Sequence, residues 1–265
     1  MTKLINYPSK YSFFILILTL FAVCSCSTPK PIVSKITGKQ IPIDQTIATD
    51  QKLENTIAPY RNNINRQLDS VLSYAPEDMD KFKGKWQTTI GNFLADITLE
   101  KASLLFRQKY SKNVDICLLN HGGIRASITK GNITTRTAYE IMPFENSLVI
   151  AELKGEQIIE MVNYFINFNR PHPIAGIQID LSEDQKSYKQ ILIQGKPLDP
   201  QLIYTVATSD YLITGGDNMA FFAKAVKIHD MNYKLRSLII DYFKEHSEVK
   251  AQIDDRILVN GVLKN

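Results

Sequence analysis

The sequence predicts a mixed α/β (α+β) domain, in which a mixed β-sheet is flanked by helices. Segments with helical spacing of apolar residues are interspersed with short apolar runs, and turns as short as 182–184 join some of these runs. Of the 265 residues, 44% are hydrophobic and 22% are charged, so the chain has enough apolar side chains for a sizeable core. No internal repeat is visible. Residues 48–265 are therefore expected to form one domain.

The elements are predicted in order from apolar periodicity and turn signals. An amphipathic helix is expected at 48–74, where apolar residues recur every three or four positions from Leu53 to Leu72. A charged loop at 77–83 follows it. The other expected elements are helices at 90–110, 136–142, 154–169 and 232–246, and strands at 114–119, 132–135, 146–153, 176–181, 189–194, 203–208 and 256–259.

The N-terminal segment differs from everything after it. Lys3 and Lys10 are the only charges before an apolar run from Phe13 to Val23. This run is shorter than the roughly 20 apolar residues that a membrane span needs. A basic start followed by a short apolar run is typical of a secretory signal.

The junction after this run, Cys24-Ser25-Cys26, resembles the processing site of a bacterial lipoprotein. Residues 1–25 are predicted to be the signal peptide, Cys26 the lipidated residue and 26–47 a lipid-anchored tether. Cys24 is the less favoured acceptor. An ordinary signal peptide or an uncleaved helix is the alternative. We expect an exported protein held by its lipid in the bacterial cell envelope, at the outer membrane or on the periplasmic side.

The sequence lacks the common signatures of cofactor binding and hydrolysis: G-x-G-x-x-G, the P-loop, G-x-S-x-G, H-E-x-x-H and C-x-x-C. A two-metal phosphoesterase centre needs several converging ligands, but His121, His172, His229 and His246 stand far apart in the sequence. We interpret His172, between two prolines, and His246, at a helix end, as surface residues. Cys117 lies in an apolar run and is expected to be buried. No catalytic residue, metal site or cofactor is predicted in this chain.

The formal charge of +4 is small and evenly spread, so the sequence does not predict nucleic-acid binding.

Three turns beside predicted strands are more informative about function. They are N-H-G-G-I-R at 120–125, P-F-E-N at 143–146 and Y-L-I-T-G-G-D at 211–217. Paired glycines bring backbone N–H groups close to a ligand. Arg125 offers a planar fork for phosphate or carboxylate. Two aromatic rings on loops can hold a flat ring between them.

The order of these motifs resembles the C-terminal domain of the 5′-nucleotidase/UDP-sugar hydrolase family. The resemblance also includes Q-T-T-I-G-N at 87–92, G-N-I-T at 131–134 and Lys154-Gly155, and it covers roughly residues 50–262. In that family this domain binds the substrate. A separate N-terminal metallophosphoesterase domain supplies two metals and the attacking water.

The resemblance implies a role for each matched residue. Phe144 and Tyr211 would stack on the nucleobase, and Asp217 would accept hydrogen bonds from ribose hydroxyls. Arg125 would reach a phosphate, and Asn120 a base or phosphate edge. The close backbone approach would be allowed by Gly122, Gly123, Gly215 and Gly216.

The sequence departs from the family pattern at two places. Gly84 stands where the family commonly has an arginine, so the bidentate phosphate contact of that arginine is not expected here. The segment between Cys26 and the first helix is too short to hold the catalytic domain. Divalent metals are therefore expected on a partner chain, a separately encoded metallophosphoesterase.

Three functions remain open at this point. The favoured one is the substrate-recognition half of a 5′-nucleotidase in nucleotide catabolism, and the alternatives are a non-catalytic nucleotide- or nucleoside-binding lipoprotein and a structural envelope protein. The ligand (AMP, a UDP-sugar, a cyclic nucleotide or a nucleoside) also stays open.

Overall fold

The computed structural model describes residues 9–23 and 32–264. Cys26 lies outside these residues, as do parts of the predicted signal peptide and tether. The chain divides into two units, 1–51 and 52–265. In the first unit, α1 (Ser9–Val23) is a helix, and residues 32–50 contain no helix or strand. Within the described part of the chain, no helix combines the length and the apolar character that crossing a membrane requires.

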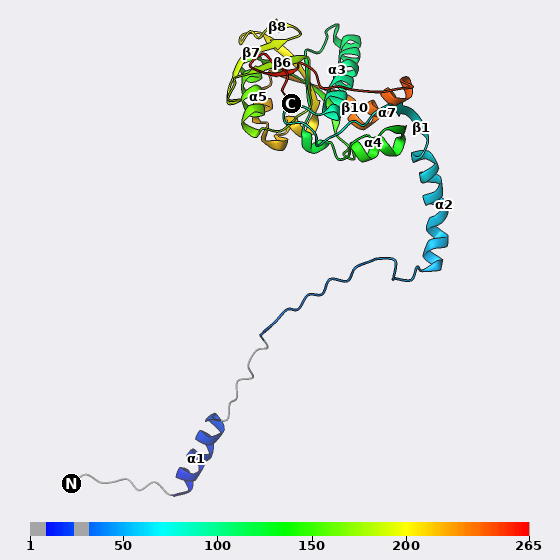
Figure 1. The fold of residues 1–265 in the computed structure, drawn as a ribbon. Coiled ribbons are helices and arrows are strands. Elements are labelled where there is room, and N and C mark those ends of the chain that lie inside the picture. Colours follow the sequence, from blue (N-terminus) through cyan, green and yellow to red (C-terminus); the bar gives the residue numbers. More distant parts are fainter. Residues whose placement is uncertain (1–8, 24–31, 265) are drawn as a thin grey trace, which may run out of the picture. The chain divides into compact units, whose positions relative to one another are not determined.

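The second unit confirms a mixed α/β fold with helices beside mixed sheets (Figure 1). Its helices are α2 (Gln51–Leu68), α3 (Thr89–Tyr110), α4 (Thr135–Ile141), α5 (Gly155–Phe168), α6 (Asp210–Ile213) and α7 (Leu235–Glu245), with 3₁₀ helices η1 (His121–Gly123), η2 (Gly216–Asn218) and η3 (Ala220–Lys224). Its strands are β1 (Val71–Ala75), β2 (Ile116–Leu118), β3 (Gly131–Thr134), β4 (Ser147–Lys154), β5 (Ile174–Ala175), β6 (Ile177–Leu181), β7 (Tyr188–Ile193), β8 (Lys196–Pro197), β9 (Ile203–Ser209), β10 (Lys227–Lys234) and β11 (Ile257–Val259).

A five-stranded mixed sheet, in the order β10-β4-β9-β2-β5, forms the centre of this unit. β9 and β2 are parallel, and the other neighbouring pairs are antiparallel. A four-stranded mixed sheet, β11-β6-β7-β8, is separate from it, and β1 and β3 form a small antiparallel pair.

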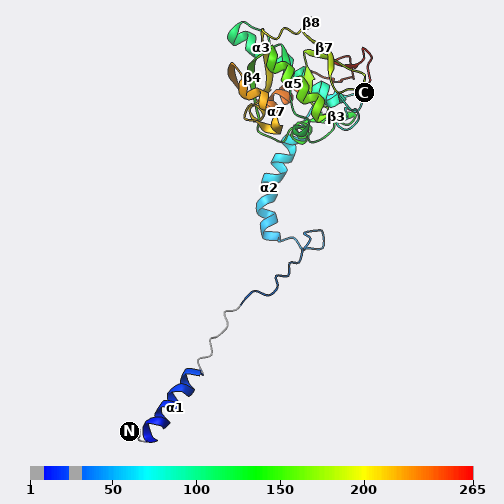
Figure 2. The same cartoon turned by 90° about the vertical axis from the view of Figure 1, so that its left-hand side faces the viewer.

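Each face of the five-stranded sheet packs on its own hydrophobic core, because side chains alternate along a strand. Cys117 and Ile150 belong to the core that α3 and α7 cover. Ile116 and Ala151 belong to the core that α5 and the four-stranded sheet cover. In Figure 1, α5 and β6–β8 lie on the left of this unit and α3 and α7 on the right, and Figure 2 shows the α5 side from the front.

The first expected helix is too long. α2 ends at Leu68, and residues 71–74, predicted as its last turn, belong to β1 instead. β1 pairs with β3, which lies some 60 positions along the chain, from Val71↔Thr134 to Ala75↔Gly131. This long-range pairing overrides the local apolar spacing. α2 buries none of its residues, so its apolar stripe stays exposed.

The helix expected at 232–246 begins too early, because β10 was missed. β10 occupies residues 227–234, and only Leu235–Glu245 is helical. β10 is an edge strand that pairs with β4, and it carries Lys227 and Asp230. Charged side chains are common on edge strands, and they conceal the strand pattern. The short β5, β8 and α6 were also missed.

Candidate functional site

Three turns meet at one end of the five-stranded sheet because of its strand directions. β2 and β9 run parallel, so the turns that follow them, containing η1 and η2, leave the sheet at the same end. β4 runs antiparallel to β9, with Leu148 paired to Ser209, so the turn before β4 arrives at that end too. Ligand sites in α/β sheets commonly lie outside the carboxyl ends of strands.

A cavity of about 330 Å³ opens between these turns. Phe144 and Tyr211, each 44% exposed, contribute rings to its wall. Gly215 and Gly216, which the sequence also singled out, are not among its lining residues. We call it the first cavity. Its lining residues are Asn120, Gly122, Gly123, Arg125, Phe144, Asn146, Tyr211 and Asp217.

The carboxylate of Asp217 is held in place from both sides. The amide Nδ2 of Asn120 donates a hydrogen bond to Oδ2 of Asp217 at 2.7 Å, and Oη of Tyr211 donates to Oδ1 at 3.1 Å. The hydroxyl of Tyr164 donates to the backbone carbonyl of Asp217 at 2.7 Å. Asn120 thus contacts Asp217 in this structure. A fixed carboxylate is a good acceptor for ligand hydroxyl groups.

Two glycines are required by close contacts within these turns. A Cβ on Gly216 would lie 2.4 Å from Cε1 of Tyr211, so the tyrosine ring lies directly on the glycine backbone. A Cβ on Gly123 would lie 2.7 Å from Oδ1 of Asn120. The glycines therefore position Tyr211 and Asn120, as well as allowing backbone to approach a ligand.

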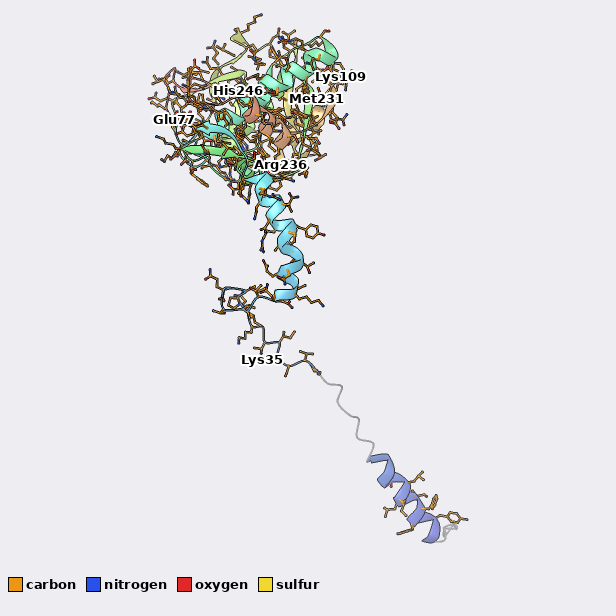
Figure 3. The ribbon with its side chains drawn as sticks, turned by 90° about the vertical axis from the view of Figure 1, so that its right-hand side faces the viewer. Lys35, Glu77, Lys109, Met231, Arg236 and His246 are labelled. Atoms are coloured by element: carbon orange, nitrogen blue, oxygen red, sulfur yellow. The ribbon has the colours of Figure 1, made fainter. Side chains whose placement is uncertain are left out.

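Arg236 fixes the turn that carries Phe144, and sequence analysis missed it. Arg236 is 8% exposed, and its Nη1 donates hydrogen bonds to the backbone carbonyls of Met142 at 3.2 Å and Pro143 at 2.9 Å. It also forms an ion pair with Glu145. Figure 3 labels Arg236, which lies near the start of α7. No local pattern marks this contact, because the two segments lie some 90 positions apart in the sequence.

Two cations lie near the η1 turn. The guanidinium of Arg125 lies 6.0 Å from the ring centroid of Phe144. Partial burial and the positive charge of Arg125 lower the pKa of Lys81, so the two cations are close. Lys85 instead hydrogen-bonds Gln185. Lys81 belongs to the charged loop before Gly84, but nothing in the sequence distinguished it from the neighbouring lysines.

The prediction that His172 lies on the surface is wrong, and His121 and His172, which are far apart in the sequence, are in contact. His172 is 4% exposed, and the backbone N–H of His121 donates a hydrogen bond to its Nδ1 at 3.3 Å. The ring packs near Tyr164 and Phe165. Burial lowers the pKa of His172 to about 4, although the charge of Asp217 partly opposes this. The ring is therefore neutral near pH 7.

His172 belongs to a second cavity of about 220 Å³, which shares Gly122 and Asp217 with the first. Its lining residues are Gly122, Tyr164, Phe168, Arg170, His172, Asp217 and Asn218. No group of three or more His, Cys, Asp or Glu side chains in residues 9–23 and 32–264 gathers closely enough to hold a metal ion. The described residues therefore do not fit a two-metal centre.

Comparisons with known proteins point to one family. A family model described as the 5′-nucleotidase C-terminal domain matches residues 75–224. The trifunctional nucleotide phosphoesterase protein YfkN of Bacillus subtilis is 27% identical over 234 residues, which is 82% of this chain and 16% of that protein. Protein UshA of Yersinia enterocolitica is 27% identical over 222 residues, 81% of this chain and 38% of that protein.

A solved structure of a 5′-nucleotidase also resembles this chain. The 5′-nucleotidase precursor from Thermus thermophilus matches with a TM-score of 0.67 and 25% identity, over 78% of this chain and 42% of that chain. The chain thus spans less than half the length of each of these three proteins. Since the family model covers more than half of the sequence, this chain belongs to the 5′-nucleotidase C-terminal domain family.

Proposed function

We propose that this chain is the substrate-recognition half of a 5′-nucleotidase, which binds nucleotides for hydrolysis together with a separately encoded metallophosphoesterase. The observation that carries the proposal is the first cavity. Two half-exposed aromatic rings, a fixed carboxylate and a guanidinium line the same hollow. These are the groups that a nucleobase, a ribose and a phosphate each require.

Each side chain has one task in this proposal. Phe144 and Tyr211 stack on the base. Asp217, oriented by Asn120, accepts hydrogen bonds from the ribose hydroxyls. Arg125 binds the phosphate, and Lys81 adds a second positive charge nearby. An anion between these two cations would relieve their mutual repulsion.

Hydrolysis is assigned to the partner. Phosphate-ester cleavage in this proposal uses a two-metal site, and the described residues supply no ligand group for one. The longer proteins that match this chain extend well beyond the matching segment, which supports a functional connection with a further domain. The contribution of this chain is to bind and orient the nucleotide.

The test is a phosphate-release assay with AMP and divalent metal. The purified chain alone should bind AMP in calorimetry and release no phosphate above background. Adding a secreted metallophosphoesterase encoded beside this chain should raise kcat/KM above that of the partner alone. Arg125→Ala should reduce the gain more than Arg125→Lys does, because lysine keeps the charge and loses only the planar fork.

Three results would decide otherwise. AMP binding with no gain in the presence of the partner would favour the non-catalytic binding lipoprotein. Absence of binding by every nucleotide tested would favour a structural envelope protein. Chelator-sensitive phosphate release by the chain alone, abolished by His121→Ala, would place the chemistry in this polypeptide.

We also propose that the protein is exported and held in the cell envelope by lipid on Cys26. The basic start, the short apolar run and the cysteine junction support this proposal. Each buried CH₂ of an acyl chain contributes about 0.8 kcal/mol, and two lipid signals suffice for stable anchoring. Cys26→Ser should therefore move the protein into the soluble fraction on cell fractionation, whereas Cys24→Ser should not. A membrane fraction unchanged by Cys26→Ser would contradict the anchor.

A further inference from the structure

The second cavity presents hydrogen-bond donors that no side chain or backbone group in residues 9–23 and 32–264 uses. Arg170 is exposed, and among the described residues its guanidinium makes no hydrogen bond or ion pair. The Nε2 atom of His172 is buried and also has no hydrogen-bond partner there. The backbone N–H of His172 donates to the carbonyl of Arg170 at 2.8 Å. This tight turn around Pro171 places both side chains on the cavity wall.

The tautomer of His172 follows from its contact with the η1 turn. Its Nδ1 accepts a hydrogen bond from a backbone N–H, so Nδ1 carries no proton. In a neutral imidazole the proton is then on Nε2. His172 therefore offers a fixed donor, and leaving a buried donor without a partner is costly. A ligand acceptor would satisfy it.

The surroundings of these donors suit a planar, neutral group better than a phosphate. Phe168 and Tyr164 contribute aromatic rings to the wall. The carboxylate of Asp217 lies on the border of the cavity and would repel an anion. Arg170 balances that charge, so the lining carries one positive and one negative formal charge. A flat ring with acceptor atoms on its edge matches this lining, because the ring can pack on the aromatic side chains while its acceptors bind the Arg170 and His172 donors.

We propose that Arg170 and His172 form a subsite that recognises the edge of a 6-oxopurine, so that the protein selects guanine or hypoxanthine nucleotides over AMP. Guanine presents two neighbouring acceptors, O6 and N7, and an arginine fork binds that pair with two hydrogen bonds. Adenine replaces O6 with an N6 donor group. The two cavities share Gly122 and Asp217 and therefore adjoin, so one nucleotide can contact both. This inference rests on the proposed nucleotide-binding function.

Calorimetric titration of the full chain with GMP, IMP and AMP tests the subsite. The wild-type protein should bind GMP and IMP more tightly than AMP. Arg170→Ala should weaken GMP and IMP binding about 5- to 150-fold, which corresponds to one bidentate arginine–base contact. AMP binding should change by less than about twofold, as for a surface substitution outside the contact. Arg170→Lys should restore only part of the preference, because it lacks the fork.

Two further variants separate recognition from folding. Arg66→Ala removes an arginine from the surface of α2 that lines neither cavity, and should alter no affinity. His172→Phe keeps a ring of similar size but lacks the Nε2 donor. It should reduce the preference for GMP over AMP, and its melting temperature shows whether the fold is intact. Arg170 is exposed, so its variants should stay folded, and they test the subsite even if His172→Phe unfolds.

Several outcomes would overturn the inference. Equal losses for GMP and AMP in Arg170→Ala would mean that Arg170 senses the shared ribose phosphate. A loss for ADP without a loss for GMP would assign the cavity to a second phosphate. AMP binding with no preference among bases in the wild type would refute the subsite and leave the proposed function standing. Failure of all nucleotides to bind would refute both.

Discussion

Phe144→Ala and Tyr211→Ala are each expected to weaken AMP binding about 5- to 150-fold. Stacking of a base on an aromatic ring is worth on the order of 1–3 kcal/mol by alanine substitution, and 1.4 kcal/mol is a factor of ten. Both rings are 44% exposed, so removing either should change the melting temperature little. Calorimetric titration with AMP measures the loss, and differential scanning calorimetry measures the melting temperature.

Matched variants distinguish stacking from other effects at these positions. Tyr211→Phe keeps the ring and removes only the hydroxyl that donates to Asp217, so it should retain most of the affinity. Tyr60→Ala removes a 71% exposed ring from α2 and should have no effect on binding. Ribose 5-phosphate, which has no base, should bind the wild type, Phe144→Ala and Tyr60→Ala alike. Equally tight binding of AMP and ribose 5-phosphate by the wild type would show that no base is stacked.

Arg256→Ala should lower the free energy of unfolding by about 3 kcal/mol, the lower end of the cost of breaking a buried ion pair. Arg256 is 8% exposed and donates to Asp254 Oδ1 at 2.7 Å, Asp96 Oδ2 at 3.0 Å and the Ile174 carbonyl at 2.6 Å. It therefore connects the strand β11 that follows it with α3 and β5. Its two carboxylate partners are about half exposed, which keeps the expected cost from rising higher.

Urea unfolding monitored by circular dichroism measures this change. Burial alone lowers the pKa of Arg256, but its hydrogen bonds with Asp254 and Asp96 raise it overall, so the guanidinium stays charged. Arg107→Ala is the control, because Arg107 is exposed and its side chain bonds Asn113, and it should cost less than about 0.5 kcal/mol. A loss below about 1 kcal/mol in Arg256→Ala would show that water replaces these contacts.

The fold was predictable from sequence wherever local pattern decides the structure. α3 is an example. It begins beside Thr88, whose side chain accepts a hydrogen bond from the N–H of Gly91 at 3.1 Å, and it ends at Ser111 in the left-handed conformation. Elements that depend on distant partners were not predictable in this way. The sequence of β1 has the apolar spacing of a helix end, and its strand structure depends on pairing with β3. The sequence of β10 has no strand pattern, and its strand structure depends on pairing with β4.

The same distinction separates the predicted site residues from the missed ones. The three turns carry glycine and aromatic signals of their own, and the parallel β2 and β9 bring two of them together. Arg236 and His172 act across the fold on segments far away in the sequence, so no local pattern marks them. The two prolines beside His172 suggested an exposed loop. In the structure they instead set up the turn that directs the ring into the protein.

The central sheet also contains a chemical reporter of its own opening. Cys117 lies on β2, has no exposed surface and is paired with Ala207 on β9 and Ala175 on β5. Burial raises the pKa of its thiol, and only a thiolate attacks disulfide reagents readily. Residues 32–264 contain no other cysteine. The rate at which a reagent such as DTNB modifies this thiol in native buffer therefore measures how often β2 separates from β9 and β5. This rate reports the kinetic stability of the five-stranded sheet, from whose end the three turns extend.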